Sequence, residues 1–266
     1  MHRASRPRKM QKKLDKAIAP VFDLRKQCRN KKVIVIGDLH GCFDELNELL
    51  NNIGWSAETY ITILTGDLVD RGPKIKETLL FAMNTPNVYS LMSNHEWKLL
   101  RYIWGRPIEK GSLAKTIEQC GETFLREPSF VNWLELLPYI IRWSDDSYVV
   151  HAGIRPDRPI NRQRKEHCIY IRTWNPKTQE IWDRQRRDPW WFEYQYLSSS
   201  LPLPIKVFFG HQQHEKPWVS SWTCSLDGGL VFGGSLRAYL DGHGLIELKA
   251  RQAYEMEENF LSATIE

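Results

Sequence analysis

The sequence predicts a layered α/β fold, and three observations support this prediction. Residues 33–36 form an unbroken β-branched run, which is typical of a strand covered on both faces by helices. After this run, apolar residues recur at helical spacing from position 43 to position 53, and Gly54 supplies a stop. The succession of strand, loop and helix then occurs twice more along the chain. We therefore expect functional loops at the C-terminal ends of the strands.

The next two rounds follow the same order of elements. The second round comprises a strand at residues 60–64 and a helix at 75–83, which Pro73 introduces because proline fits the first turn of a helix. The third round comprises a short strand at residues 88–91 and a helix at 96–103.

The pattern changes in the second half of the chain. Two helices, at residues 112–120 and 129–136, are expected to follow each other without a strand between them. Strands then dominate, with β-like runs at residues 139–143, 148–150, 207–209, 219–224 and 236–240.

Composition indicates a folded protein with a basic N-terminal arm. The 266 residues are 42% apolar, which is enough for a sizeable core, and no run approaches the roughly 20 apolar residues that cross a bilayer. The five cysteines are scattered without a Cys-x-x-Cys pair, which favours a reducing, cytoplasmic location. We divide the chain into an arm at residues 1–31 and a globular domain at 32–266.

The charge of the chain is concentrated in this arm. Residues 1–32 contain 12 Lys or Arg and only two Asp, whereas the rest of the chain is mildly acidic. Such a segment can bind nucleic acid by counterion release, and it can equally be a solvated tail without a partner.

Side chains that bind metals follow the first two predicted strands. Asp38 and His40 come directly after the first strand, and an extended Asp-x-His sequence places both side chains on one side of the backbone. Asp67 follows the second strand, and its two oxygens could bridge one ion to another about 3.5 to 4 Å away. We therefore expect a first ion to be held by Asp38, His40 and Asp67.

Three further candidate ligands follow other predicted strands. Asn94 offers an amide oxygen, and His151 and His211 offer imidazole nitrogens. A single histidine at a strand end is more often structural than a ligand, but six candidates at strand ends are hard to obtain by chance. The second ion is expected to be held by Asp67, Asn94, His151 and His211.

The mixture of ligands narrows the choice of metal. Carboxylate, amide and imidazole groups suit manganese, iron or zinc better than calcium, and the lack of thiolates argues against a closed structural site. Manganese is our first choice for both ions, with iron, zinc or nickel as alternatives.

Five blocks of the sequence resemble the signature motifs of the phosphoprotein-phosphatase branch of the calcineurin-like metallophosphoesterases. In the family's order, they are GDLHG at 37–41, GDLVDRG at 66–72, NHE at 94–96, VHAG at 150–153 and GH at 210–211. The tail LDGGLVFGG at 226–234 resembles bacterial-type members, which include symmetrical diadenosine tetraphosphatases and bacterial and phage serine/threonine phosphatases.

This resemblance implies a fold and a reaction. The fold would be a β-sandwich flanked by helices, with a dimetal site at the C-terminal ends of the strands, formed by a catalytic domain at residues 32–266. The reaction would be hydrolysis of a phosphoester by a water or hydroxide that bridges two divalent metals, without a phosphoenzyme intermediate.

The resemblance also implies four catalytic residues. His95, directly after Asn94, would donate a proton to the leaving group, and Asp70 would hold it protonated. Arg71 would form paired hydrogen bonds with phosphate oxygens. The family's second phosphate-binding arginine matches Arg172, which follows a run of aromatic and β-branched residues, although other arginines lie nearby.

The sequence departs from the family in two places. Ser93 stands where the family usually has glycine, and we expect the turn to survive, with strain if its φ is positive. The aromatic segment 183–200 has no counterpart in the family pattern, and it is either a flap facing the substrate or a satellite core.

Three classes of substrate remain open. The main prediction is a serine/threonine-type phosphomonoester in a phosphoprotein. The alternative is a diadenosine polyphosphate, because residues 155–187 carry a local charge of +6 among aromatic rings that can stack on adenine. A polynucleotide end is the third class, favoured by the basic arm. A binding protein without turnover is disfavoured, because every expected metal ligand is present, and so are His95 and Asp70, the expected acid pair.

Overall fold

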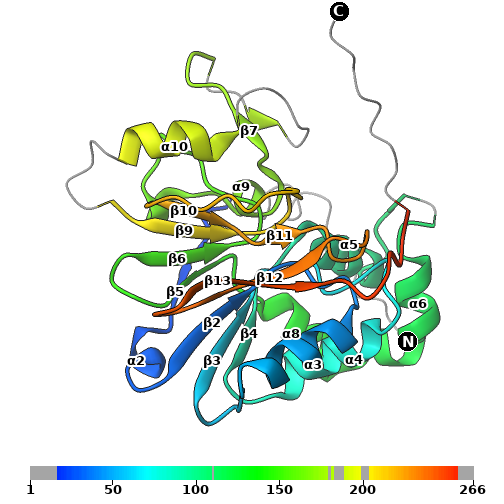
Figure 1. Ribbon diagram of the computed structural model, residues 1–266. Helices are drawn as coiled ribbons and strands as arrows, with labels where there is room; N and C mark the ends of the chain where they lie inside the picture. The colour runs from blue at the N-terminus through cyan, green and yellow to red at the C-terminus, as the bar shows by residue number, and fades with distance from the viewer. Residues whose placement is uncertain (1–16, 110, 179–180, 183–188, 199–203, 257–266) are drawn as a thin grey trace, which may run out of the picture.

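Two β-sheets pack face to face in the computed structural model (Figure 1), which describes residues 17–109, 111–178, 181–182, 189–198 and 204–256. The first sheet has the strand order β1 (Val21–Asp23), β5 (Ile140–Arg142), β6 (Ser147–Val150), β9 (Lys206–Phe209) and β10 (Thr223–Ser225). The second has the order β11 (Asp227–Gly228), β12 (Ser235–Leu240), β2 (Lys32–Ile36), β3 (Tyr60–Leu64) and β4 (Val88–Ser90), and β13 (Gly244–Lys249) also pairs with β12. A separate ribbon pairs β7 (Thr173–Trp174) with β8 (Ile181–Trp182).

Successive side chains of a strand enter two different cores. In β2, Val33 and Val35 pack between the two sheets, where they meet Phe208 of β9, while Ile34 and Ile36 face the helices on the outer side. The sequence prediction of a strand buried on both faces is therefore confirmed for β2. Its expectation of helices on both faces is wrong, because the other sheet covers one of them.

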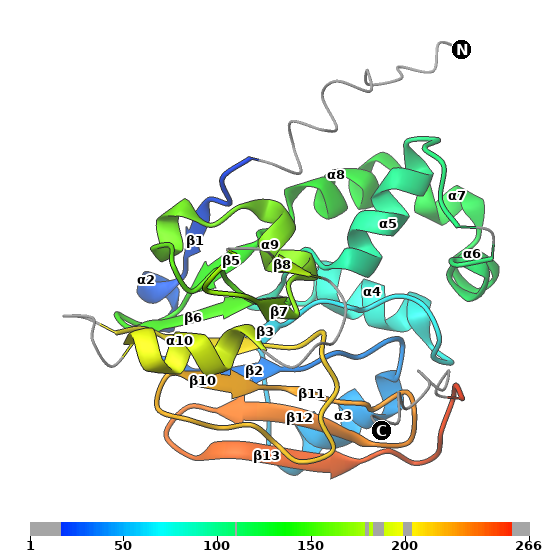
Figure 2. The same cartoon turned by 90° about the horizontal axis from the view of Figure 1, so that it is seen from above.

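Helices cover the outer faces of this sandwich. Figure 1 shows α3 (Phe43–Asn52) and α4 (Ile75–Asn84) on one side and α10 (Trp190–Ser198) on the other. Figure 2 shows further helices gathered on one flank, namely α5 (Asn94–Ile103), α6 (Ala114–Cys120), α7 (Glu122–Leu125) and α8 (Pro128–Leu136). The remaining helical segments are α2 (Arg25–Cys28), α9 (Lys165–Tyr170) and a 3-10 turn at Ile160–Arg162. Among the described residues, no helix is both long and apolar enough to span a membrane.

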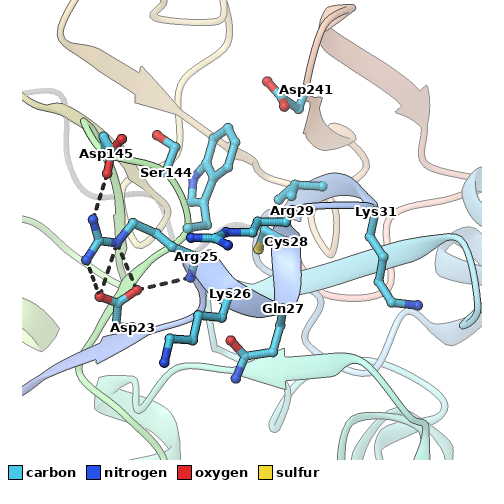
Figure 3. A pocket seen from close by; sticks show the side chains of 12 residues that line it. Asp23, Arg25, Lys26, Gln27, Cys28, Arg29, Lys31, Ser144, Asp145 and Asp241 are labelled. Atoms are coloured by element: carbon cyan, nitrogen blue, oxygen red, sulfur yellow. Dashed lines mark hydrogen bonds and ion pairs between the residues drawn. The ribbon is translucent and has the colours of Figure 1, made fainter.

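Part of the predicted basic arm belongs to the fold. Strand β1 pairs in parallel with β5, and the side chain of Leu24 is fully buried between the sheets. The guanidinium of Arg25 binds Asp23 at 2.8 Å and Asp145 at 2.6 Å, which ties α2 to the turn after β5 (Figure 3). The described fold therefore begins at residue 17, within the expected arm, and residues 1–16 lie outside the described part of the chain.

A hollow of about 700 Å³ lies beside this junction (Figure 3). Val33, which lines it, stands at the start of β2, whereas the predicted metal ligands follow the end of that strand. The hollow is therefore at the opposite edge of the sheet from the candidate site.

One buried histidine outside the predicted site leads to a prediction about pH. His167 of α9 is only 1% exposed, and burial, together with the charges of Arg155 and Arg158, lowers its pKa to about 3. Because the unfolded chain binds a proton at this position near pH 6.5, the unfolded state gains stability as the pH falls below that value. Between pH 7 and pH 5 we expect His167 to cost the fold about 2 kcal/mol. Urea unfolding would be measured at both pH values. The free energy of unfolding should fall less between pH 7 and pH 5 in His167→Gln than in the parent protein, and the difference should equal this amount.

The exposed His243 supplies the control for that measurement. The pH dependence of unfolding should be the same in His243→Gln as in the parent protein. An equal loss of stability in the parent and in His167→Gln would contradict the assignment of this acid sensitivity to His167.

Candidate metal centre and catalytic site

The predicted ligands gather at one edge of the sandwich. Strands β2 and β3 run parallel, as do β6 and β9, so their C-terminal ends lie at the same edge of each sheet. Among the described residues, two buried groups of side chains have ligand atoms within 4.8 Å of one another. The first group is His40, Asp67 and His95, and the second is Asp67, His151 and His211.

Asp67 belongs to both groups because its two oxygens face different ways. Oδ2 lies 3.4 Å from His40 Nε2 and 3.9 Å from His95 Nε2, while Oδ1 lies 3.5 Å from His151 Nε2. Burial alone would raise the pKa of Asp67, but the nearby histidines, His95 first, hold it well below its ordinary value. Oδ1 is buried without a hydrogen-bond partner. An ionised carboxylate divided between two groups fits the expected bridge between two cations.

Two imidazoles are oriented as metal ligands usually are. His40 Nδ1 donates to the carbonyl oxygen of Val69 at 2.8 Å, and His151 Nδ1 donates to that of Thr65 at 3.0 Å. Burial lowers the pKa of His151, which favours its neutral form. The neutral ring of His151 then turns its Nε2 lone pair toward Asp67 Oδ1, and a lone pair that faces a carboxylate needs a cation between them.

The remaining expected ligands lie beside these groups. Asn94 Oδ1 is 2.8 Å from His151 Nε2, and His211 Nδ1 is 3.2 Å from the same nitrogen. His211 Nε2 is buried without a partner, which leaves a second ligand atom uncommitted. The donor set therefore fits divalent cations in both chemistry and burial.

Asp38 is close to the centre but lies outside both groups. Its carboxylate accepts hydrogen bonds from Thr65 Oγ1 at 2.8 Å and from the backbone N–H of His211 at 2.7 Å. Gly210 makes this approach possible, because a Cβ at that position would overlap Asp38 Oδ1. Burial, together with the charges of Asp227 and Asp67, raises the pKa of Asp38 well above its ordinary value. A cation at the centre would stabilise the ionised carboxylate.

Backbone strain is concentrated at the site. Six non-glycine residues in the described part of the chain have positive φ, and five of them carry site side chains. A residue in this left-handed region costs free energy unless its surroundings hold it there. The five site residues with positive φ are His40, Asp67, Asp70, Arg71 and His211.

The predicted acid pair forms directly. His95 Nδ1 lies 2.7 Å from Asp70 Oδ2, and the ammonium of Lys98 lies 2.7 Å from the same oxygen. Burial lowers the pKa of His95 to about 4, although Asp67 and Asp70 act in the opposite direction. That Asp70 holds His95 protonated, as the resemblance implies, stays a prediction. The negative charge of a bound phosphate would raise this pKa again.

Both predicted phosphate-binding arginines lie near histidines of the centre. Arg71 Nη1 donates to His40 Nε2 at 2.8 Å, and its guanidinium lies over the ring of Phe232 with a distance of 5.2 Å to the ring centroid. Burial first, and then the charge of Arg172, lowers the pKa of His211 well below its ordinary value, so Arg172 is near the second group. Arg155 is instead held by Asp157 at 2.6 Å.

Ser93 caps a helix where the family usually has glycine. Its φ is −111°, so the strain that a positive φ would bring does not arise. Its hydroxyl accepts the backbone N–H groups of His95 and Glu96, and it also donates to the Glu96 carboxylate. The spacing of Ser93 and Glu96 matches a capping box, a signal that sequence reasoning overlooked.

Glu96 in turn organises the loop after β3. Its buried carboxylate accepts the backbone N–H of Asp67 at 2.8 Å, of Leu68 at 2.9 Å and of Val69 at 3.3 Å. Glu96, in the first turn of α5, therefore fixes the backbone at Asp67, the residue that belongs to both groups. This role of Glu96 was not predicted from the sequence.

The aromatic segment splits between core and surface. Trp190 and Trp191 of α10 are almost fully buried and pack on Phe209 at centroid distances of 5.0 and 5.2 Å. Phe192 is 43% exposed and packs on Trp218. The two tryptophans thus belong to the main hydrophobic core rather than to a separate satellite core, while residues 183–188 and 199–200 of the expected flap lie outside the described residues.

Together, the sandwich and its buried Asp/His centre define a metal-dependent phosphoester hydrolase. Residues 31–244 match the calcineurin-like phosphoesterase family, and the chain belongs to this family. The resemblance drawn from the five sequence blocks is therefore confirmed.

Two similar proteins are named as bis(5'-nucleosyl)-tetraphosphatases. The symmetrical bis(5'-nucleosyl)-tetraphosphatase of Neisseria meningitidis is 40% identical over 131 residues, which are 48% of this chain and 45% of that protein. The chain thus matches about half the length of this relative. The asymmetrical bis(5'-nucleosyl)-tetraphosphatase PrpE of Bacillus velezensis is 28% identical over 245 residues, which are 83% of this chain and 94% of that protein.

Solved structures share the fold. A structure assigned as a diadenosine tetraphosphatase aligns with a TM-score of 0.70 and 26% identity over 87% of this chain and 98% of that one. A serine/threonine phosphatase from Saccharomyces cerevisiae aligns with a TM-score of 0.54 and 16% identity over 90% of this chain and 85% of that one. The second likeness is one of fold alone.

Proposed function

We propose that the chain hydrolyses dinucleoside polyphosphates such as diadenosine tetraphosphate. The observation that carries this proposal is the match to tetraphosphatases over most of the length of both proteins. It favours the alternative of the sequence analysis over the phosphoprotein, which was the main prediction. Two arginines at the metal centre, Arg71 and Arg172, suit a substrate that presents several phosphate groups.

The side chains at the strand ends have distinct tasks in this proposal. Cations held by Asp38, His40 and Asp67, and by Asp67, Asn94, His151 and His211, would supply a solvent nucleophile at neutral pH and neutralise phosphate charge. Arg71 and Arg172 hold phosphate oxygens and so orient the phosphorus toward the centre. His95, oriented by Asp70, gives its proton to the departing oxygen.

A substrate panel tests the proposal. Full-length protein with manganese would be given diadenosine tetraphosphate, a phosphoserine peptide, p-nitrophenyl phosphate and a phosphorylated DNA end, and kcat/KM would be compared. The proposal expects the dinucleotide to be the best substrate by at least about tenfold, or about 1.4 kcal/mol. A phosphoserine peptide hydrolysed better than the dinucleotide would restore the phosphoprotein prediction.

The same reaction reveals the position of attack. Symmetrical cleavage gives two molecules of ADP, whereas asymmetrical cleavage gives ATP and AMP, so chromatography of the products distinguishes the two. The longer match to the asymmetrical relatives favours ATP and AMP.

The proposal also covers the preferred metal ion, the cellular location and the role of the basic arm. We propose manganese as the preferred ion, to be tested by comparing turnover with manganese, iron, nickel and zinc after chelation.

The described cysteines are all free thiols, in keeping with the proposed cytoplasmic location. The arm is tested with a shortened protein that starts at residue 17. If this protein loses only its hydrolysis of DNA ends, nucleic-acid binding is assigned to the basic arm.

Replacing Arg172 by Ala is expected to raise KM by about tenfold or more, because a charge-assisted hydrogen bond to phosphate is worth about 1.5 to 3 kcal/mol. Steady-state kinetics with p-nitrophenyl phosphate would measure this change. Arg158→Ala is the matched control, because Arg158 acts on His167 rather than on the metal centre. An equal rise of KM in both variants would remove Arg172 from the substrate site.

A further inference from the structure

Helix α6 is bonded to the loop that carries the acid pair and the phosphate-binding arginine. This loop spans residues 70–74, directly before α4, and α6 lies about 45 residues further along the chain. Three polar side chains of α6 form hydrogen bonds with the loop. They are Lys115, Thr116 and Gln119.

Thr116 makes two hydrogen bonds with a single residue. Its hydroxyl accepts the backbone N–H of Asp70 at 3.1 Å and donates to Asp70 Oδ1 at 2.7 Å. Thr116 is fully buried, so its hydroxyl is satisfied within the protein by Asp70. Because Oδ1 is taken by Thr116, the other oxygen, Oδ2, is the one that faces His95 at 2.7 Å.

The two neighbouring side chains hold the backbone that follows. Lys115 Nζ donates to the carbonyl of Arg71 at 2.8 Å, and Gln119 Nε2 donates to that of Gly72 at 2.8 Å. Gln119 Oε1 accepts the backbone N–H of Ile75 at 2.7 Å. Helix α6 therefore satisfies backbone groups along the length of the loop.

The loop needs such support because of its conformation. Asp70 and Arg71 are consecutive non-glycine residues with φ of 68° and 72°, a region that L-residues avoid. Gly72 follows, and a Cβ at that position would overlap the carbonyl oxygen of His40. The strained loop is thus pressed against the first group of ligands, and bonds from outside the loop keep it there.

We propose that α6 is a positioning helix for the catalytic loop and that Thr116 is a positioning residue, which fixes Asp70 and through it the ring of His95. Thr116 acts through Asp70 and makes no contact of its own with the reacting atoms. The inference rests on the proposed role of His95 and Asp70, so its effect on kcat is expected with substrates whose leaving group must take up a proton.

Kinetics of Thr116→Val test the proposal, because valine keeps the shape of threonine and removes its hydroxyl. With a phosphoserine peptide we expect kcat to fall about 10- to 100-fold with KM within about twofold. Thr116→Ser, which retains the hydroxyl, should restore kcat to within about threefold of the parent. Thr123→Val on the neighbouring helix α7, at an exposed threonine, is the matched control and should leave kcat unchanged.

A double variant separates positioning from a general loss of structure. In a His95→Gln background, Thr116→Val should lower kcat no further, because both changes act on the same proton transfer. Fully multiplicative losses, or a Thr116→Ser variant as slow as Thr116→Val, would overturn the proposal.

Hydrogen exchange gives a readout that needs no turnover. The backbone N–H of Asp70 should exchange faster in Thr116→Val, while amides of the inter-sheet strand β2 keep their protection. If the parent protein hydrolyses no member of the panel, the proposed function fails, yet this exchange still decides whether α6 holds the loop. Unchanged exchange at residues 70–72 would reject the positioning helix.

Discussion

Replacing Asp67 by Asn is expected to lower kcat at least about a thousandfold, which corresponds to about 4 kcal/mol of transition-state stabilisation. Asp67 is the residue common to both groups of ligand atoms, and its two oxygens face His40 and His151 separately. An amide in its place removes the negative charge and leaves one oxygen instead of two. Turnover of p-nitrophenyl phosphate and the metal content of the purified protein should therefore fall together.

The outcome is checked against a carboxylate at the opposite edge of the sheet. Asp241→Asn changes an exposed residue beside the hollow next to α2, and it should keep both kcat and metal content. A variant with Asp67→Asn that kept two metal ions and more than a tenth of the parent kcat would refute the shared carboxylate. Full turnover of the parent after exhaustive chelation would refute the need for metal altogether.

The central strands of the fold follow from local sequence, whereas its edges do not. Residues 33–36 and 60–64 are apolar at every position but one, and both were predicted as strands that the structure confirms. Strand β1 has only three residues, and its pairing with β5, about 120 residues away, makes it a strand. Strand β13 is half exposed and follows a turn, so its pattern lacks a buried face that sequence reasoning could detect.

The predicted boundaries of one strand were wrong. The strand expected at residues 219–224 is limited to β10 at Thr223–Ser225, because Trp218 folds back and donates from Nε1 to Thr223 Oγ1 at 2.8 Å. The chain turns here, so that the backbone N–H of Ser225 donates to the carbonyl of Trp218 at 2.9 Å and Val219 lies opposite Cys224 instead of continuing the same strand.

The residues of the candidate site also divide into those that the sequence predicted and those that it did not. The residues that sequence reasoning selected stand directly after strands, so the parallel order of the sheets was enough to bring His40, Asp67 and His151 together. Thr116 and Lys98 could not be found, because they meet Asp70 through helix packing over 46 and 28 residues. The lowered pKa of His95 also depends on burial, which the sequence does not reveal.

Replacing His95 by Gln is expected to slow substrates in proportion to how poor their leaving group is. A positioned acid contributes about 10²- to 10⁴-fold where the departing oxygen must take up a proton. We therefore expect kcat for a phosphoserine peptide, which releases an alkoxide, to fall at least about a hundredfold. The release of p-nitrophenolate, a far better leaving group, should slow by less than about tenfold. Asp70→Asn should show the same pattern, because Asp70 orients the ring of His95.

The metal content of the variant distinguishes two possible roles of His95, namely proton donor and metal ligand. Its Nε2 lies 3.9 Å from Asp67 Oδ2 and belongs to the first group of ligand atoms, so the ring could bind a cation instead of moving a proton. A proton donor predicts that His95→Gln keeps its metal and loses activity according to the leaving group. A ligand predicts loss of one metal ion and an equal slowing of all substrates, because the nucleophile rather than the leaving group is then affected. The exposed His243→Gln variant is expected to differ from the parent in neither measurement.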